Sequence, residues 1–158
     1  MKLFQMLMCG ILLIGFSCTE ELKPTPYTYT TIFTGEHSKT WKLKFLEITL
    51  NGEVKETFNV ACAADDEYKF YANTEHTYEA HTGANKCNDP AEANVITDSW
   101  TFNNATATLT MLLPFFRTDS SIPFIVREAK KSKLEIEIFF TGENKESYRI
   151  HFESTSEN

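Results

Sequence analysis

The sequence predicts an all-β domain, an antiparallel up-and-down barrel of about eight strands. Three observations predict this fold. From residue 38 onward, apolar residues recur at every second position, β-branched and aromatic residues are abundant, and turn residues interrupt the pattern at short intervals. Strands that pair in sequence in this way can close into a barrel, which removes exposed sheet edges.

The first expected strand covers residues 41–50. Its alternating pattern slips by one residue near the middle, and such a slip predicts a bulge or bend. Asn51-Gly52 follows directly and is the strongest short signal for a β-hairpin. It leads into a second strand over residues 54–58.

The middle of the chain reads as further hairpins. A strand that begins at Tyr68 turns at Asn73-Thr74 and returns over Thr77 to Ala80. A loop is expected from Gly83 to Asp98. The remaining strands are expected over residues 100–102, 109–113, 124–130, 134–140 and 148–152.

Residues 1–17 are typical of a bacterial lipoprotein signal peptide. Lys2 supplies the positive charge of a short N-terminal region. The apolar segment that follows is shorter than the roughly 20 residues of a membrane-spanning helix. The stretch Gly15-Phe16-Ser17-Cys18 resembles the lipobox read by the lipoprotein signal peptidase. Ordinary secretion is the alternative, because small residues also precede its cleavage sites. We expect lipidation at Cys18, with palmitate among the acyl chains, and anchoring in the bacterial outer membrane, facing the periplasm or the cell surface.

Residues 18–37 are rich in Thr and Pro and have no helical period, so they predict a flexible, extended tether. The pair Ile32-Phe33 near its end is apolar enough to pack on the domain. One barrel domain is expected over residues 38–158.

Cysteine usage agrees with export. After cleavage and lipidation of Cys18, only Cys62 and Cys87 remain, and an oxidising compartment would join them in a disulfide. Metal binding is the alternative, but zinc sites usually contain closely spaced Cys or His ligands, which these two cysteines lack.

Charge and motifs argue against several function classes. The net charge of −7 disfavours nucleic acid as a partner. No nucleophile motif or phosphate-binding loop is present, so no catalytic residue, cofactor or metal is expected. His76 and His81 would face opposite sides of a strand. Asp65-Asp66-Glu67 reads as a solvated entrance to a strand rather than a calcium loop.

Several short stretches occur in a characteristic order along the chain: Lys39-Thr40-Trp41-Lys42-Leu43, Ala61-Cys62, Asp65-Asp66-Glu67-Tyr68-Lys69-Phe70, Tyr78, Cys87 and Ser99-Trp100-Thr101-Phe102. Together they resemble the lipocalin-like domain of bacterial lipoproteins over roughly residues 38–153. The resemblance implies an up-and-down barrel with a Trp near the first strand and an open mouth.

Aromatic residues are the candidates for ligand contact. They are Trp41, Phe70, Tyr78 and Trp100, which face inward, and Phe115 and Phe116, which lie near the mouth with the loop 83–98. Their alternative role is to fill the barrel, since eight strands leave room for side chains or one small ligand.

The chain is therefore expected to be a membrane-anchored, non-enzymatic module that binds a small apolar molecule. The alternative is an accessory or scaffold lipoprotein with a solid barrel, which docks on an envelope protein complex.

Overall fold

The computed structural model describes residues 29–87, 93–116, 119–140 and 146–157. These residues form one ten-stranded sheet with two short helices. In chain order the elements are α1 (Tyr29–Thr34), β1 (Ser38–Leu50), β2 (Glu53–Phe58), the 3-10 helix η1 (Ala61–Ala63), β3 (Glu67–Tyr71), β4 (Thr77–His81), β5 (Val95–Ser99), β6 (Thr101–Asn103), β7 (Thr108–Met111), β8 (Ile122–Ala129), β9 (Lys133–Phe139) and β10 (Glu146–Glu157).

The predicted signal peptide and Cys18 lie outside the described residues. None of the helices in the described part of the chain has the length and apolar character needed to cross a membrane.

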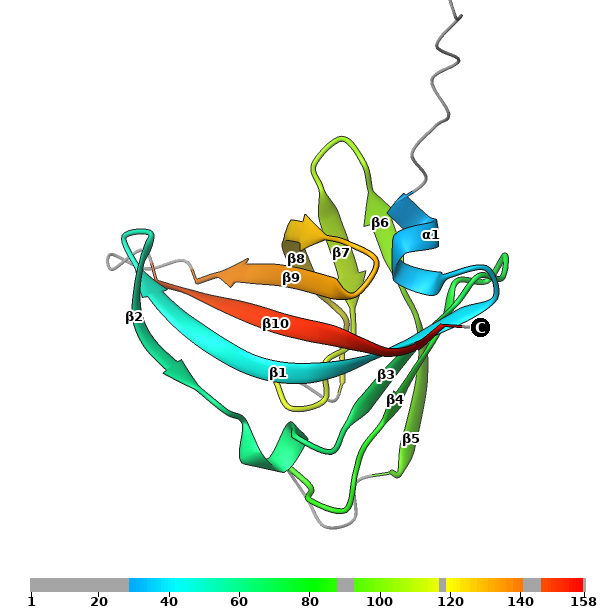
Figure 1. Cartoon of the computed structure of the whole chain (residues 1–158), viewed down its shortest axis with the longest axis horizontal. Coiled ribbons are helices and arrows are strands. Elements are labelled where there is room, and N and C mark those ends of the chain that lie inside the picture. The colour runs from blue at the N-terminus through cyan, green and yellow to red at the C-terminus, as the bar shows by residue number, and fades with distance from the viewer. Residues whose placement is uncertain (1–28, 88–92, 117–118, 141–145, 158) are drawn as a thin grey trace, which may run out of the picture.

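The sheet curls into a nearly closed antiparallel barrel (Figure 1). Its strands follow the order β5-β4-β3-β1-β10-β9-β8-β7-β6. The two ends of this path, β5 and β6, are separated in the chain only by Trp100, so the chain itself bridges the seam. β2 pairs with the second half of β1 and β3 with its first half. β2 and β3 therefore share one position in the barrel wall, next to β1, and β5 and β6 share another. With these pairs taken as single positions, the strand order around the barrel confirms the predicted up-and-down arrangement.

Both local signals in the first hairpin are confirmed. Asn51 and Gly52 have φ of 53° and 83°, the left-handed conformation that a tight hairpin turn requires. The register of β1 against β10 shifts between Leu43 and Phe45. This bulge accounts for the slip in the apolar pattern, because one extra residue reverses the faces of all later side chains.

Aromatic and aliphatic side chains fill the barrel. Those exposed by 2% or less include Trp41, Tyr68, Phe70, Tyr78, Trp100, Leu109, Met111, Leu113, Phe124, Leu134, Ile136, Ile150 and Phe152. They pack as one cluster, with ring contacts such as Phe70 to Tyr78 at 5.0 Å and Tyr68 to Phe152 at 5.5 Å between centroids. Burial of this apolar surface is the main force that stabilises the fold.

The end of the predicted tether is helical rather than extended. α1 covers one end of the barrel (Figure 1) and inserts the fully buried ring of Phe33 into it. Two β1 side chains hold the helix in place: Lys39 Nζ donates to the carbonyl of Ile32 at 3.1 Å, and Trp41 Nε1 donates to that of Phe33 at 2.9 Å. Burial of Phe33 and these bonds stabilise a helix too short to be stable alone.

The expected loop from Gly83 to Asp98 contains a strand that the sequence did not predict. β5 pairs with β4 along its whole length, from Thr77 opposite Ser99 to His81 opposite Val95. Its side chains are exposed or half-buried. Because only the half-buried Ile96 of this strand packs against the core, the strand lacks the run of alternating apolar residues by which the other strands were recognised.

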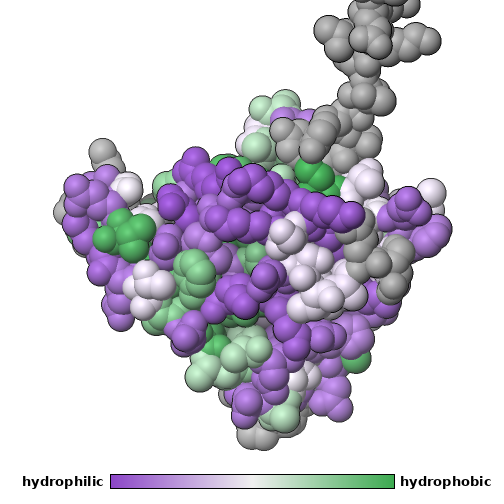
Figure 2. Space-filling model, viewed as in Figure 1, coloured by the Kyte–Doolittle hydropathy of each residue, from purple (hydrophilic) through white to green (hydrophobic). Residues whose placement is uncertain are grey.

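The outer face of β1, β8, β9 and β10 carries a network of charged side chains, and the face over β1 and β10 is mainly hydrophilic (Figure 2). Glu137, only 2% exposed, accepts hydrogen bonds from Arg127 and from Ser147 Oγ, the latter at 2.6 Å. The alternation along β10 predicts a solvated, outward-facing His151, but its side chain is buried, with ring nitrogens 3.1 Å from carboxylates of Glu47 and Glu135.

Candidate functional site

The candidate site lies at the end of the barrel opposite α1 (Figure 1). The connection between β2 and β3, which contains η1, and the segment that follows β4 meet there. The connection between β7 and β8 also lies at this end, because β7 runs antiparallel to β6 and away from α1. We call this end the mouth.

A disulfide ties two of these segments together. Cys62 in η1 is bonded to Cys87, with their Cα atoms 4.9 Å apart. This confirms the pairing predicted from the cysteine count. The bond holds η1 against the segment after β4 at the rim of the mouth.

Two carboxylates reinforce this junction. Asp66 Oδ1 accepts a hydrogen bond from the Gly83 amide at 2.8 Å, and Asp65 Oδ2 accepts bonds from the amides of Ala84 and Asn85 at 2.7 and 3.3 Å. Asp66 is buried, so the solvated strand entrance expected from the sequence is wrong for this residue. The two carboxylates instead satisfy backbone N–H groups of the opposite segment.

The two carboxylates have opposite pKa shifts. Burial raises the pKa of Asp66, and hydrogen bonds from Gly83 and Tyr68 only partly offset this effect. Burial would also raise the pKa of Asp65, but hydrogen bonds from the Ala84 and Asn85 amides outweigh it and lower this pKa. Asp65 is therefore the more firmly ionised of the two.

Gly83 is required at the junction because of space. A Cβ atom placed on it would lie 2.1 to 2.4 Å from the carboxylate atoms of Asp65. The sequence alone gave no sign of this contact, since the two residues are brought together only by the pairing of β3 with β4.

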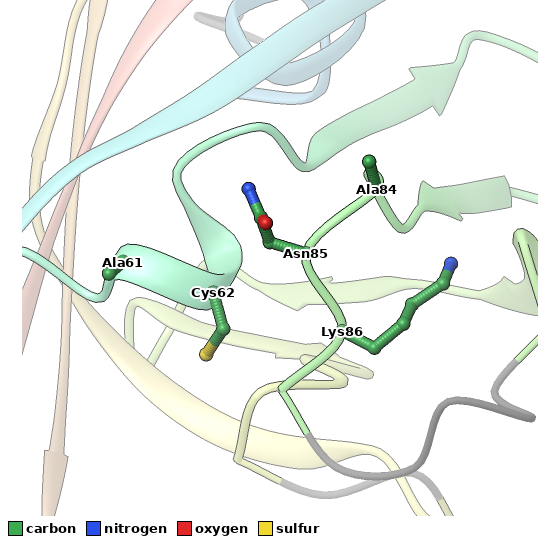
Figure 3. Close-up of a pocket in the computed structure, with 5 residues that line it drawn as sticks. All are labelled: Ala61, Cys62, Ala84, Asn85 and Lys86. Atoms are coloured by element: carbon green, nitrogen blue, oxygen red, sulfur yellow. The ribbon is translucent and has the colours of Figure 1, made fainter.

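A hollow of about 670 Å³ opens between η1 and the segment after β4. The described residues that line it are Ala61, Cys62, Ala84, Asn85 and Lys86 (Figure 3). Its volume falls in the range of small-molecule sites, about 300 to 1,000 Å³, but the hollow is wide open to solvent and would enclose only part of a ligand. The methyl groups and the disulfide sulfur offer apolar contact, and the Asn85 amide offers both a hydrogen-bond donor and an acceptor.

The Lys86 side chain extends away from Cys62 in Figure 3. Its ammonium group donates to Asn94 Oδ1 at 3.1 Å, to the Thr82 carbonyl at 3.3 Å and to the Thr82 hydroxyl. Because these three bonds use all its donors, Lys86 contributes its aliphatic stem to the hollow.

The predicted ligand-contact residues fall into two groups. Trp41, Phe70 and Tyr78 are buried in the packed core, and Trp100 is buried at the seam between β5 and β6, near α1. None of these four lines the hollow at the mouth.

Phe115 and Phe116 lie in the connection between β7 and β8, at the mouth. Both are half-buried against the core, and their ring centroids are 4.8 Å apart. Phe116 also contacts Tyr148, at 5.9 Å. Their role in ligand binding stays a prediction.

The histidines are held by different neighbours. His81 Nε2 lies 3.0 Å from Glu79 Oε2, whereas the ring of His76 packs on Trp100. Among the described residues, no group of three or more His, Cys, Asp or Glu side chains is placed to hold a metal ion.

No model of a known protein family matches the chain, and no curated protein matches it.

Proposed function

We propose that this protein is a lipid-anchored, non-enzymatic binding module that holds a small molecule at the mouth of its barrel. The observation that supports this proposal is the hollow between η1 and the segment after β4, which lies outside the packed core. The ligand suited to this lining has an apolar body, which contacts Ala61 and Ala84, and one polar group, which meets the Asn85 amide. The lipocalin-like resemblance agrees with a ligand carrier, but the filled interior favours binding at the mouth.

Native mass spectrometry of protein extracted from membranes tests the ligand. The wild-type protein is expected to carry a bound small molecule. Ala61→Trp should remove it by filling the hollow, whereas Thr57→Trp, which introduces the same side chain on exposed β2, should leave it bound. Absence of any added mass, or its retention in Ala61→Trp, would contradict binding at this hollow.

The anchor is tested separately. Cys18→Ala should release the protein into the soluble fraction and abolish its labelling by a radioactive fatty acid, because the acyl chains provide the membrane affinity. Continued labelling would show that Cys18 is not the lipidated residue.

A second candidate function is docking on an envelope protein complex. Two observations favour docking. The interior of the barrel is filled, and the consecutive residues Phe139 and Phe140 are 51% and 43% exposed, as apolar side chains at contact surfaces often are. In this case cross-linking in cells should join a partner to the wild-type chain and to Val95→Ser, but not to Phe139→Ser. Equal cross-linking of both variants would argue against this surface.

A further inference from the structure

β2 is a strand with one free edge. Within the described part of the chain it pairs only with β1, along one side. It is the outermost strand at the left of Figure 1, and no labelled strand lies beyond it. The edge of a strand carries a row of backbone N–H and C=O groups that can pair with another chain. β2 therefore presents a surface for strand addition.

The side chains of β2 leave this edge open. Its first five residues are exposed, and only Phe58 is half-buried. They include the apolar Val54, which is 48% exposed. Lys55 donates to Glu53 of the same strand at 2.7 Å, but an exposed ion pair of this kind is weak. It uses one of the three ammonium donors of Lys55, so the side chain can also bind a partner.

The backbone directs two residues of β2 toward the free edge. In an antiparallel pair, residues that bond to the neighbouring strand alternate with residues that do not. The pair that flanks the Asn51-Gly52 turn is of the bonded kind, so Val54, which follows it, directs its N–H and C=O groups away from β1. Lys55 has no register partner in β1 and is an extra residue. Because of this bulge, Thr57 is the next residue that faces the free edge.

Val54 and Thr57 also lie on the same face of the sheet. Their partners in β1, Thr49 and Glu47, are two residues apart and so point to the same side. A second copy of β2, placed antiparallel on the free edge, brings Val54 of each chain opposite Thr57 of the other. Each such pair can exchange two backbone hydrogen bonds, and both side chains are β-branched, which suits a pleated sheet.

The charges of β2 are complementary in this register. Lys55 of each chain lies opposite Glu56 of the other, so the pairing creates two contacts between opposite charges. A pair centred on Lys55 or on Glu56 would instead place that residue opposite its own copy. A pair centred between Val54 and Lys55 would place Glu53 opposite Glu56. Charged residues on an edge strand oppose pairing in general, and those of β2 oppose these neighbouring registers.

We propose that β2 pairs antiparallel with β2 of a second copy of this chain, about a twofold axis between Lys55 and Glu56. The pairing joins the sheets of two barrels in a symmetric dimer. The interface is small, because each chain contributes one strand of six residues. Association is therefore weak and depends on concentration.

Charge reversal tests the register. Lys55→Glu and Glu56→Lys, each alone, place like charges opposite each other and should weaken self-association about tenfold or more. The double variant restores opposite charges and should associate as the wild type does. A mixture of the two single variants should form a heterodimer, because each chain supplies the charge that the other lacks. Sedimentation of the full chain in detergent, from micromolar to millimolar concentration, measures these affinities.

A pair of cysteines tests the contact in cells that express the full chain. Residues opposite each other in an antiparallel pair have Cα atoms about 4.5 to 5.5 Å apart, a distance that a disulfide can span. Val54→Cys/Thr57→Cys should therefore form a disulfide-linked dimer on mild oxidation. Val95→Cys/Thr97→Cys places the same two thiols on exposed positions of β5 and should form little dimer.

Four outcomes would overturn the proposal. They are a wild type that stays monomeric at every concentration, association that the single charge reversals leave unchanged, equal dimer formation by the two cysteine pairs, and cross-linking of the β2 pair to a different protein instead of a second copy. β2 shares no residue with the described lining of the hollow at the mouth, so this proposal stands or fails independently of the proposed function.

Discussion

Replacement of Phe33 by alanine should separate α1 from the barrel. The Phe33 ring is fully buried and lies 5.1 Å from Phe102, 5.8 Å from Trp100 and 6.4 Å from Phe70 between centroids. Two of these contacts are edge-to-face, a favoured arrangement for aromatic rings. The substitution therefore removes the side chain that closes this end of the barrel.

The expected cost follows from this burial. Truncation of a buried Phe to Ala costs about 3 to 5 kcal/mol in protein cores. The lower end applies here, because α1 is short and can settle partly into the space, so we expect a loss of about 3 kcal/mol. For a domain of this size that loss lowers Tm by about 10 °C.

Urea unfolding followed by tryptophan fluorescence measures this change, because Trp100 is in contact with Phe33. Phe33→Leu retains most of the apolar volume and should cost less than about 1.5 kcal/mol. Phe139→Ala, the same truncation at a side chain that is 51% exposed, should cost less than about 1 kcal/mol. A Phe33→Ala loss no larger than that of Phe139→Ala would refute the role of α1 as a structural part of the barrel.

Three further predictions concern the rest of the molecule. Burial would raise the pKa of Glu137, but hydrogen bonds from its hydroxyl and guanidinium neighbours hold it below its ordinary value. The stability it contributes is thus complete above the unfolded pKa and is lost as pH falls through the folded pKa, so acid unfolding curves should be flatter for Glu137→Gln. Gly83→Ala should destabilise the protein by about 1 to 3 kcal/mol through overpacking, as measured by urea unfolding, and adding Asp65→Ala should recover part of the loss. The Cys62→Ala/Cys87→Ala double variant should lose roughly 3.5 kcal/mol, the chain-entropy value for this loop, by the same measurement; an unchanged midpoint would contradict a structural role.

The sequence was sufficient for the features that depend on neighbouring residues. Alternation placed the strands with large inward side chains, and Asn51-Gly52 placed the first hairpin. Cysteine number predicted the disulfide. β5 was missed because it contributes little to the core, and α1 because a single apolar pair carries no helical period.

The junction at the mouth and the packing of His76 on Trp100 depend on contacts between distant segments. Asp65 meets the amides of Ala84 and Asn85, nearly twenty residues away, only after β3 and β4 have paired. His76 meets Trp100 at the end of the β4–β5 pair, next to Thr77 and Ser99, which lie opposite each other. No local pattern encodes such pairs, so the structure was needed to find them.

The two ends of the barrel are closed by different means, so a substitution at one end should leave the other end unaffected. A disulfide and carboxylate bonds hold the mouth together, whereas the packing of Phe33 closes the other end. Loss of the disulfide should therefore weaken ligand binding at the mouth and leave the NMR signal of the Trp100 indole unchanged. Loss of Phe33 should disturb the signal of Trp100, whose ring it contacts, and leave the mouth intact, because the mouth is held by its own disulfide and carboxylate bonds. A variant at one end that disturbed both ends would show that the barrel responds as a single unit.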